Sequence, residues 1–189
     1  MRFPDYAEKQ FDWWNLLQRV RPLKGKRILD CGFHSGCDAM FWAGEAAEYI
    51  AIDLNANAVA AAQQLDCPAY FLCGDMTHLQ FVDESFDLVF NFSSLDHLDR
   101  NTQDDAIAEV VRVLINGGHL LISFPNLLAP DFKNVVVGLS NFQGLVDQEE
   151  RFDPDDLLDR LKSFGLTFRY YATLGGEIRA RRVGFIMQK

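Results

Sequence analysis

Short apolar runs alternate with helical segments along most of this chain. Buried strands are predicted at the run that begins with Ile28 and Leu29 and at four later runs, Tyr49–Asp53, Ala69–Cys73, Phe86–Asn91 and His119–Phe124. Helices are predicted over 37–47, 56–65 and 102–114, with Asn55 as the cap candidate of the second and Thr102, together with Asp105, as the cap of the third. Because parallel strands need crossover connections, this order predicts an α/β fold with a doubly wound, mostly parallel sheet.

The C-terminal part predicts how the sheet ends. Asp153-Pro154 has the form of a helix start, with a capping side chain followed by a first-turn proline, and the helix is expected to end near Gly165. Two β-rich runs follow, joined by Gly175-Gly176, which is a hairpin signal. A seven-stranded sheet with an antiparallel C-terminal hairpin strand is therefore expected.

The chain of 189 residues is long enough for one domain, which we expect over residues 25–189. An N-terminal helical cap is expected over residues 1–24. Asp5 and Glu8 resemble a capping box, and the helix that they open would continue to about Val20.

Composition and charge exclude several classes of function. A net charge of −9 argues against a general affinity for nucleic acid, because binding to phosphates depends on Lys and Arg. No apolar run approaches the roughly 18 residues of a membrane span. The N-terminus carries acids and a proline where a signal peptide has its apolar core, so the cytoplasm is the expected location.

The four cysteines offer no Cys-x-x-Cys pair. They are Cys31, Cys37, Cys67 and Cys73, and we expect buried free thiols rather than disulfides or metal ligands.

A glycine turn follows the first predicted strand. Gly32 and Gly36 let backbone amides approach a ligand closely, and the helix N-terminus behind them favours negative charge. The turn by itself is also compatible with a purely structural role.

Three acids end successive predicted strands: Asp30, Asp53 and Asp75. In such sheets ligands bind outside the carboxyl ends of the strands, near the point where the strand order reverses. Asp53, about 20 residues beyond the turn, stands where a ribose diol is held. Asp75 can accept from an exocyclic amine such as that of adenine. The three acids together predict a nucleoside-like ligand.

These residues resemble a family, the class I S-adenosylmethionine-dependent methyltransferases, in their small-molecule, ubiquinone-biosynthesis-like branch. The resemblance covers about residues 25–125 and the order of the C-terminal elements. Segments similar to the motifs of that family are 28–36, 52–54, 74–76, 86–97 and 109–118. There are two departures. His34 stands where the family usually has the central glycine of its first motif, and Asn116 replaces a proline before the fifth strand.

The resemblance implies a Rossmann-like methyltransferase fold, S-adenosylmethionine as cofactor and direct in-line transfer of a methyl group. It places the backbone of Gly32, Phe33 and Gly36 near the methionine part of the cofactor and Asp30 toward its ammonium group, and a side chain at His34 takes up space nearby. Leu54 and Met76 would flank the adenine, and Asn91 and Phe92 would lie near the methyl group. No metal is expected.

The acceptor is expected to be a small, partly apolar molecule, because the residues that would shape its pocket are rich in aromatic side chains: Tyr6, Trp13 and Trp14. His97, in the loop after the fourth strand, is the candidate base, since its unperturbed pKa lies near neutrality, although packing explains it equally well. A non-catalytic cofactor-binding or protein-interaction module and, less favoured, a nicotinamide-dependent oxidoreductase are the alternatives. The oligomeric state is open.

Overall fold

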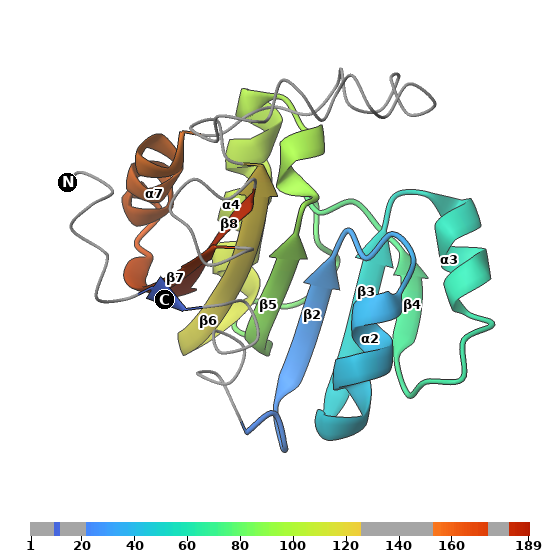
Figure 1. Ribbon diagram of the computed structural model, residues 1–189. Coiled ribbons are helices and arrows are strands. Elements are labelled where there is room, and N and C mark those ends of the chain that lie inside the picture. Colours follow the sequence, from blue (N-terminus) through green and yellow to red (C-terminus); the bar gives the residue numbers. More distant parts are fainter. Residues whose placement is uncertain (1–9, 12–21, 126–152, 174–181) are drawn as a thin grey trace.

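An eight-stranded sheet forms the centre of the chain (Figure 1), as seen in a computed structural model that describes residues 10–11, 22–125, 153–173 and 182–189. The strand order across the described sheet is β1-β7-β8-β6-β5-β2-β3-β4. The strands are β1 (Gln10–Phe11), β2 (Arg27–Cys31), β3 (Glu48–Asp53), β4 (Tyr70–Cys73), β5 (Phe86–Phe92), β6 (Leu114–Pro125), β7 (Thr167–Thr173) and β8 (Arg182–Gln188).

The pairing of the strands confirms the predicted sheet. β2 lies parallel to both β3 and β5, β3 is parallel to β4, and β5 is parallel to β6. β8 is antiparallel to β6 and β7, as expected for the C-terminal hairpin strand. All seven predicted strands are therefore present, and the two-residue β1, parallel to β7, is an additional one.

Strand β1 corrects one expectation. The prediction of a continuous helix from Asp5 to Val20 is wrong at two residues. Gln10 and Phe11 form a strand instead, in which they pair with Tyr171 and Ala172 of β7. The remaining residues of the expected cap up to 21 lie outside the described residues.

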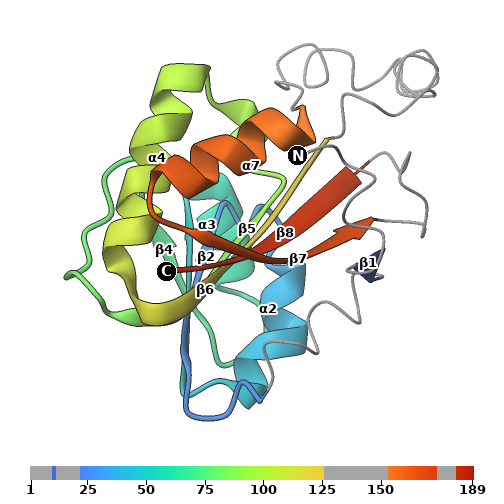
Figure 2. The same cartoon turned by 90° about the vertical axis from the view of Figure 1, so that its left-hand side faces the viewer.

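Helices cover both faces of the sheet (Figure 2). On one face, α2 (Cys37–Trp42), which continues as a 3-10 turn over Ala43–Glu45, and α3 (Ala56–Ala62) pack on Tyr49, Phe71 and Leu88. On the other face, α4 (Arg100–Val113) and α7 (Pro154–Ser163) pack on Leu29, Ile50 and Val89. A short 3-10 helix, η3 (Leu95–His97), follows β5. None of the described helices is both long and apolar enough to cross a membrane.

Side-chain caps fix where the helices begin. Asn55 accepts from the backbone N–H groups of residues 57 and 58, and Asp153 accepts from that of residue 155, so both predicted caps are confirmed. The cap expected at Thr102 is wrong. Asp99 caps α4 instead, and the Thr102 hydroxyl donates to its Oδ2 at 2.6 Å.

The strand order reverses between β2 and β5. From β2 the chain proceeds outward to β3 and β4, and it then returns to place β5 on the other side of β2. The crevice at the carboxyl ends of β2 and β5 is the place where sheets of this kind bind ligands.

Candidate cofactor-binding site

Gly32 brings the two sides of this crevice into contact. Its backbone N–H donates to the Ile52 carbonyl at 2.8 Å, and its φ is +78°. A Cβ at this position would lie 2.3 Å from the Cβ of Ser94, the second residue after β5. Ser94 in turn donates its hydroxyl to the Cys31 carbonyl at 2.8 Å. The close approach of the β2 and β5 ends therefore requires glycine at position 32.

Asp53 ties the glycine turn to the end of β3. Its Oδ2 accepts from the backbone N–H of His34 and its Oδ1 from that of Asn55, both at 2.9 Å. Each carboxylate oxygen has a second lone pair, so these bonds leave acceptor capacity for a ligand hydroxyl. Asp53 is thus held in place by the backbone and can still accept from a diol.

Asp75 and Met76 follow β4 on the far side of the same pocket. Asp75 Oδ1 accepts from the backbone N–H and the hydroxyl of Thr77, at 2.9 and 2.7 Å. The side-chain amide of Asn91 donates to the Met76 sulfur at 3.6 Å. The Asn91 oxygen accepts from the Leu95 backbone N–H at 3.2 Å, and its side chain is buried. Asn91 therefore supports Met76 and the start of η3.

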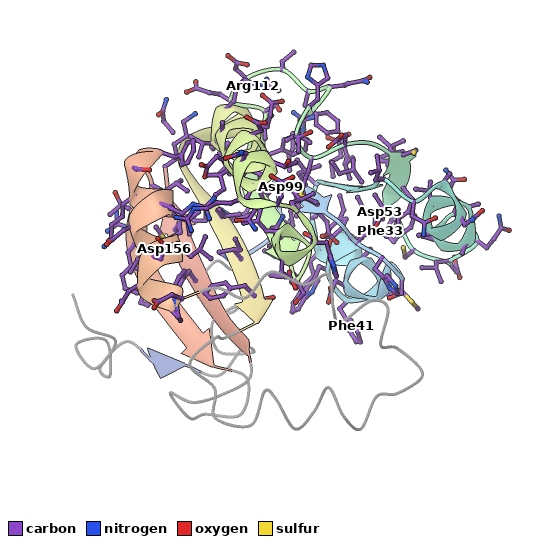
Figure 3. All side chains as sticks on the ribbon, turned by 90° about the horizontal axis from the view of Figure 1, so that it is seen from above. Phe33, Phe41, Asp53, Asp99, Arg112 and Asp156 are labelled. Atoms are coloured by element: carbon purple, nitrogen blue, oxygen red, sulfur yellow. The ribbon has the colours of Figure 1, made fainter. Side chains whose placement is uncertain are left out.

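One pocket gathers five of the predicted cofactor residues. Its walls are formed by Gly32, Ile52, Asp53, Leu54, Gly74, Asp75, Met76 and Leu98. The described residues enclose about 50 Å³ there, which is less than a whole nucleoside needs, and Leu54 is 72% exposed at its rim. Figure 3 shows Asp53 and Phe33 close together in the region between α2 and α3.

The other predicted residues do not line this pocket. Phe33 is buried with its ring centroid 5.0 Å from that of Phe71, and the ring of Phe92 stacks on that of Phe90 at 5.1 Å. A Cβ at Gly36 would lie 3.0 Å from Leu65 and Phe71, so this glycine serves the packing of the turn. His34 and His97 are exposed. Tyr6, Trp13 and Trp14 lie outside the described residues.

Asp30 is buried beside the pocket instead of forming its wall. Its side chain is 2% exposed, and its Oδ2 accepts from the Tyr49 hydroxyl at 2.8 Å. Burial is the largest cause that raises the pKa of Asp30 to about 7, and the charges of Asp38 and Asp53 raise it further. The hydrogen bond from Tyr49 lowers the pKa and so opposes the shift. The predicted contact between Asp30 and the cofactor's ammonium group stays a prediction.

Sequence reasoning missed several members of the site. Ser94 and Leu98 belong to it through tertiary packing alone, and no local pattern marks them. Asp38 has no role in the sequence-based expectations, yet burial raises its pKa and it interacts electrostatically with Asp30. Together with Asp53, these carboxylates make this end of the sheet acidic, which favours a cationic ligand.

The Asp30→Asn variant is expected to change how stability depends on pH. In the folded chain Asp30 holds its proton up to about pH 7, whereas unfolded it titrates near 3.8. The native state therefore binds more protons within this window, so the wild-type free energy of unfolding falls as the pH rises from 4 to 7. The introduced amide can still accept from Tyr49, and the variant should be more stable than wild type by about 4 kcal/mol at pH 8 but not at pH 4. Urea unfolding of both proteins from pH 4 to pH 8 measures the free energy of unfolding. A difference between wild type and variant that stays the same at every pH would contradict the prediction.

A second variant tests His34. Its φ of +51° lies in the left-handed region, where a side chain costs about 1 kcal/mol or more and glycine costs little. We expect His34→Gly to keep cofactor affinity within about tenfold, or roughly 1.4 kcal/mol. His34→Ala keeps the strain but removes the imidazole, and is the control. Titration with S-adenosylhomocysteine measures both, and a larger loss in both variants would show that the imidazole binds the ligand.

The residues present fit the cofactor that the resemblance implies. At the reversal point, Asp53 offers lone pairs to a diol, and Leu54 and Met76 supply apolar surface on the same pocket as Asp75. This set of groups matches the ribose, the adenine ring and the exocyclic amine of a nucleoside.

Comparison with known proteins agrees with the geometry. Residues 29–122 match the family model described as "Methyltransferase domain". The phthiotriol/phenolphthiotriol dimycocerosates methyltransferase of Mycobacterium leprae is 39% identical over 105 residues, which are 52% of this chain and 37% of that protein. The ubiquinone/menaquinone biosynthesis C-methyltransferase of Dinoroseobacter shibae is 26% identical over 207 residues, covering 95% of this chain and 79% of that protein.

Solved structures share the fold. A SAM-dependent methyltransferase from Methanosarcina mazei has a TM-score of 0.75 at 20% identity, over 95% of this chain and 99% of that one. The chain spans only 37% to 53% of the length of the first three curated relatives that it matches. By its family match, the chain carries a methyltransferase domain over residues 29–122, and its fold is that of solved SAM-dependent methyltransferases.

Proposed function

We propose that this chain transfers the methyl group of S-adenosylmethionine to a small-molecule acceptor. The observation that carries the proposal is the shared pocket of Gly32, Asp53, Leu54, Asp75 and Met76 at the reversal point of the sheet. Family and fold imply S-adenosylmethionine as the cofactor.

The proposed roles follow from the positions of the side chains. Asp53 accepts hydrogen bonds from the ribose hydroxyls, Asp75 accepts from the adenine amine, and Leu54 and Met76 pack on the ring. The cofactor supplies an electrophilic methyl group on a sulfonium. The positive charges of the cofactor would lower the raised pKa of the nearby Asp30 and so favour its ionised form, and the charge of Asp38 adds to the attraction. Transfer is a direct in-line displacement, so the protein's contribution is alignment and exclusion of water.

For the acceptor we propose a compact, partly apolar molecule. Relatives named for phthiotriol dimycocerosates and for ubiquinone/menaquinone biosynthesis support the partly apolar character of the acceptor. Tyr6, Trp13 and Trp14 are the proposed acceptor-side residues. His97 is the proposed base where the nucleophile carries a proton, and its exposed position on η3 leaves it accessible. A cytoplasmic location and the lack of a nucleic-acid partner stay predictions from the sequence.

A turnover assay tests the proposal. The chain is incubated with S-adenosylmethionine and a panel of phenolic, quinol and carboxylate acceptors, and the release of S-adenosylhomocysteine is measured. Release that depends on one acceptor class supports the proposal. The alternative, a cofactor-binding module without turnover, predicts tight binding of S-adenosylmethionine and no release above the acceptor-free background with any member of the panel.

A further inference from the structure

The pocket depends on a segment without regular structure of its own. Residues 76–85, which we call the 76–85 loop, connect β4 to β5 through turns and bends only. Its first residue, Met76, is a wall of the pocket. Because the loop has no helix or strand to satisfy its backbone, other groups must bond its N–H and C=O groups.

Two side chains of α4 supply three of these bonds, in addition to two that the N–H groups of residues 84 and 85 make with backbone carbonyls at the end of α4. Arg112 donates from Nη2 to the Leu79 carbonyl and from Nη1 to the Phe81 carbonyl, both at 2.8 Å. Its Nη1 also donates to the Asp83 carboxylate at 2.7 Å. Glu109 Oε2 accepts from the Leu79 backbone N–H at 2.7 Å. Figure 3 shows Arg112 on the outer side of α4, far from Phe41 of α2.

Glu109 and Arg112 also hold each other. They lie one turn apart on α4, and Arg112 donates Nε to Oε1 at 2.7 Å and Nη2 to Oε2 at 2.8 Å. The bond with Arg112 lowers the pKa of Glu109, so the carboxylate stays charged at neutral pH. The guanidinium is therefore fixed in direction before it meets the loop, as a bidentate pair requires.

The geometry points to Glu109 and Arg112 as a positioning pair for the adenine side of the pocket, an inference that rests on the proposed function. Met76 is supported from one side by the Asn91 amide, and three residues later the chain is clamped at Leu79 by both members of the pair. Loss of the pair frees the loop between Met76 and residue 84, while the Asn91 amide and the bonds from the N–H groups of residues 84 and 85 to α4 carbonyls remain. Met76 then samples positions that no longer pack against an adenine ring, and affinity falls.

Arg160 offers a matched control. It lies on α7 and donates to the side chains of Asp104 and Gln103 and to the Arg100 carbonyl, so it also clamps α4 through a guanidinium. Its side chain is 11% exposed, compared with 30% for Arg112. These three partners all belong to α4, and none of them lies in the loop. Gln103 also donates its side-chain amide to the carbonyl of Leu98, a wall of the pocket, at 2.8 Å, and this bond does not involve Arg160. Arg112→Met and Arg160→Met therefore remove the same chemical group from two clamps on α4, of which only the first holds the loop that carries Met76.

The test compares three measurements for wild type, Arg112→Met and Arg160→Met. All are made at a temperature well below the melting temperature of each protein. These are the free energy of unfolding in urea, the Kd for S-adenosylhomocysteine by calorimetry, and amide hydrogen exchange of residues 77–84. We expect both variants to lose stability. Only Arg112→Met should raise the Kd, by at least tenfold, and speed exchange in the loop, while Arg160→Met keeps the Kd within twofold.

Arg112→Lys covers the case in which Arg112→Met does not fold. A lysine ammonium can donate to one or two of the loop carbonyls but cannot form the bidentate bond with Glu109, so an intermediate rise in Kd is expected. An unchanged Kd in a folded Arg112 variant that has lost stability overturns the inference, as does equal weakening by Arg160→Met. Absence of binding to wild type contradicts the proposed function itself, and the inference falls with it.

Discussion

Gly32→Ala is expected to destabilise the chain by about 3 kcal/mol or more and to weaken cofactor binding by more than a hundredfold. The new Cβ would lie 2.3 Å from the Cβ of Ser94, a distance that the two side chains cannot share. The backbone adds to this cost, because a φ of +78° strains any residue with a Cβ by about 1–2 kcal/mol. The ends of β2 and β5 must move apart, and the pocket wall moves with them.

Variants at two other glycines distinguish the steric contact with Ser94 from the backbone strain. Gly25 has a φ of +81°, but a Cβ there would have nothing within 4 Å, so Gly25→Ala reports the backbone strain alone. Gly44 has open space and no positive φ, so Gly44→Ala should change stability by less than about 0.5 kcal/mol. Both controls should keep the wild-type Kd for S-adenosylhomocysteine. Equal loss of affinity in Gly32→Ala and Gly25→Ala would mean that the contact with Ser94 does not shape the pocket.

Asp53→Ala is expected to weaken cofactor binding by at least a hundredfold, about 2.8 kcal/mol. The substitution removes the predicted acceptor of the ribose hydroxyls and also frees the backbone N–H groups of His34 and Asn55. Calorimetric titration with S-adenosylhomocysteine measures the loss. Asp105→Ala, an exposed acid on α4, is the control and should leave the Kd unchanged.

Asp53 has two roles here, the support of the glycine turn and the proposed binding of the ribose, and a change of ligand distinguishes them. Wild type should bind the 2′-deoxy analogue of S-adenosylhomocysteine more weakly than the parent compound. In Asp53→Ala this difference should largely disappear, because the partner of the missing hydroxyl is already gone. A penalty for the deoxy analogue that is the same in both proteins would show that Asp53 acts on the turn alone.

The sequence predicted those parts of the fold that local patterns determine. Asn55 and Asp153 cap helices because a short polar side chain beside the first turn bonds the free N–H groups, which is a local signal. The cap predicted at Thr102 is wrong because the helix begins three residues earlier: Asp99 accepts from the N–H groups of residues 101 and 102, so Thr102 lies within the first turn and donates to the cap. β1 depends on a partner strand about 160 residues away, and no window around Gln10 contains that information.

The candidate site could likewise be predicted only where its position follows from local patterns and strand order. Asp53 and Asp75 could be predicted because parallel strands place their carboxyl ends at one edge, and both line the pocket. Asn91 was expected near the methyl group, but its amide is occupied by Met76 and Leu95, and only the packing of the loop and η3 reveals this. Arg112 lies 36 residues from Met76 along the chain, so its effect on the pocket depends wholly on tertiary contacts.

The most direct test of the proposed function is calorimetric titration of the chain with S-adenosylmethionine, S-adenosylhomocysteine and NAD. We expect both adenosyl ligands to bind at one site per chain, with Asp53→Ala abolishing the heat, and no binding of NAD. Binding of NAD alone, or wild-type affinity for the adenosyl ligands in Asp53→Ala, would contradict the assignment of this pocket to S-adenosylmethionine.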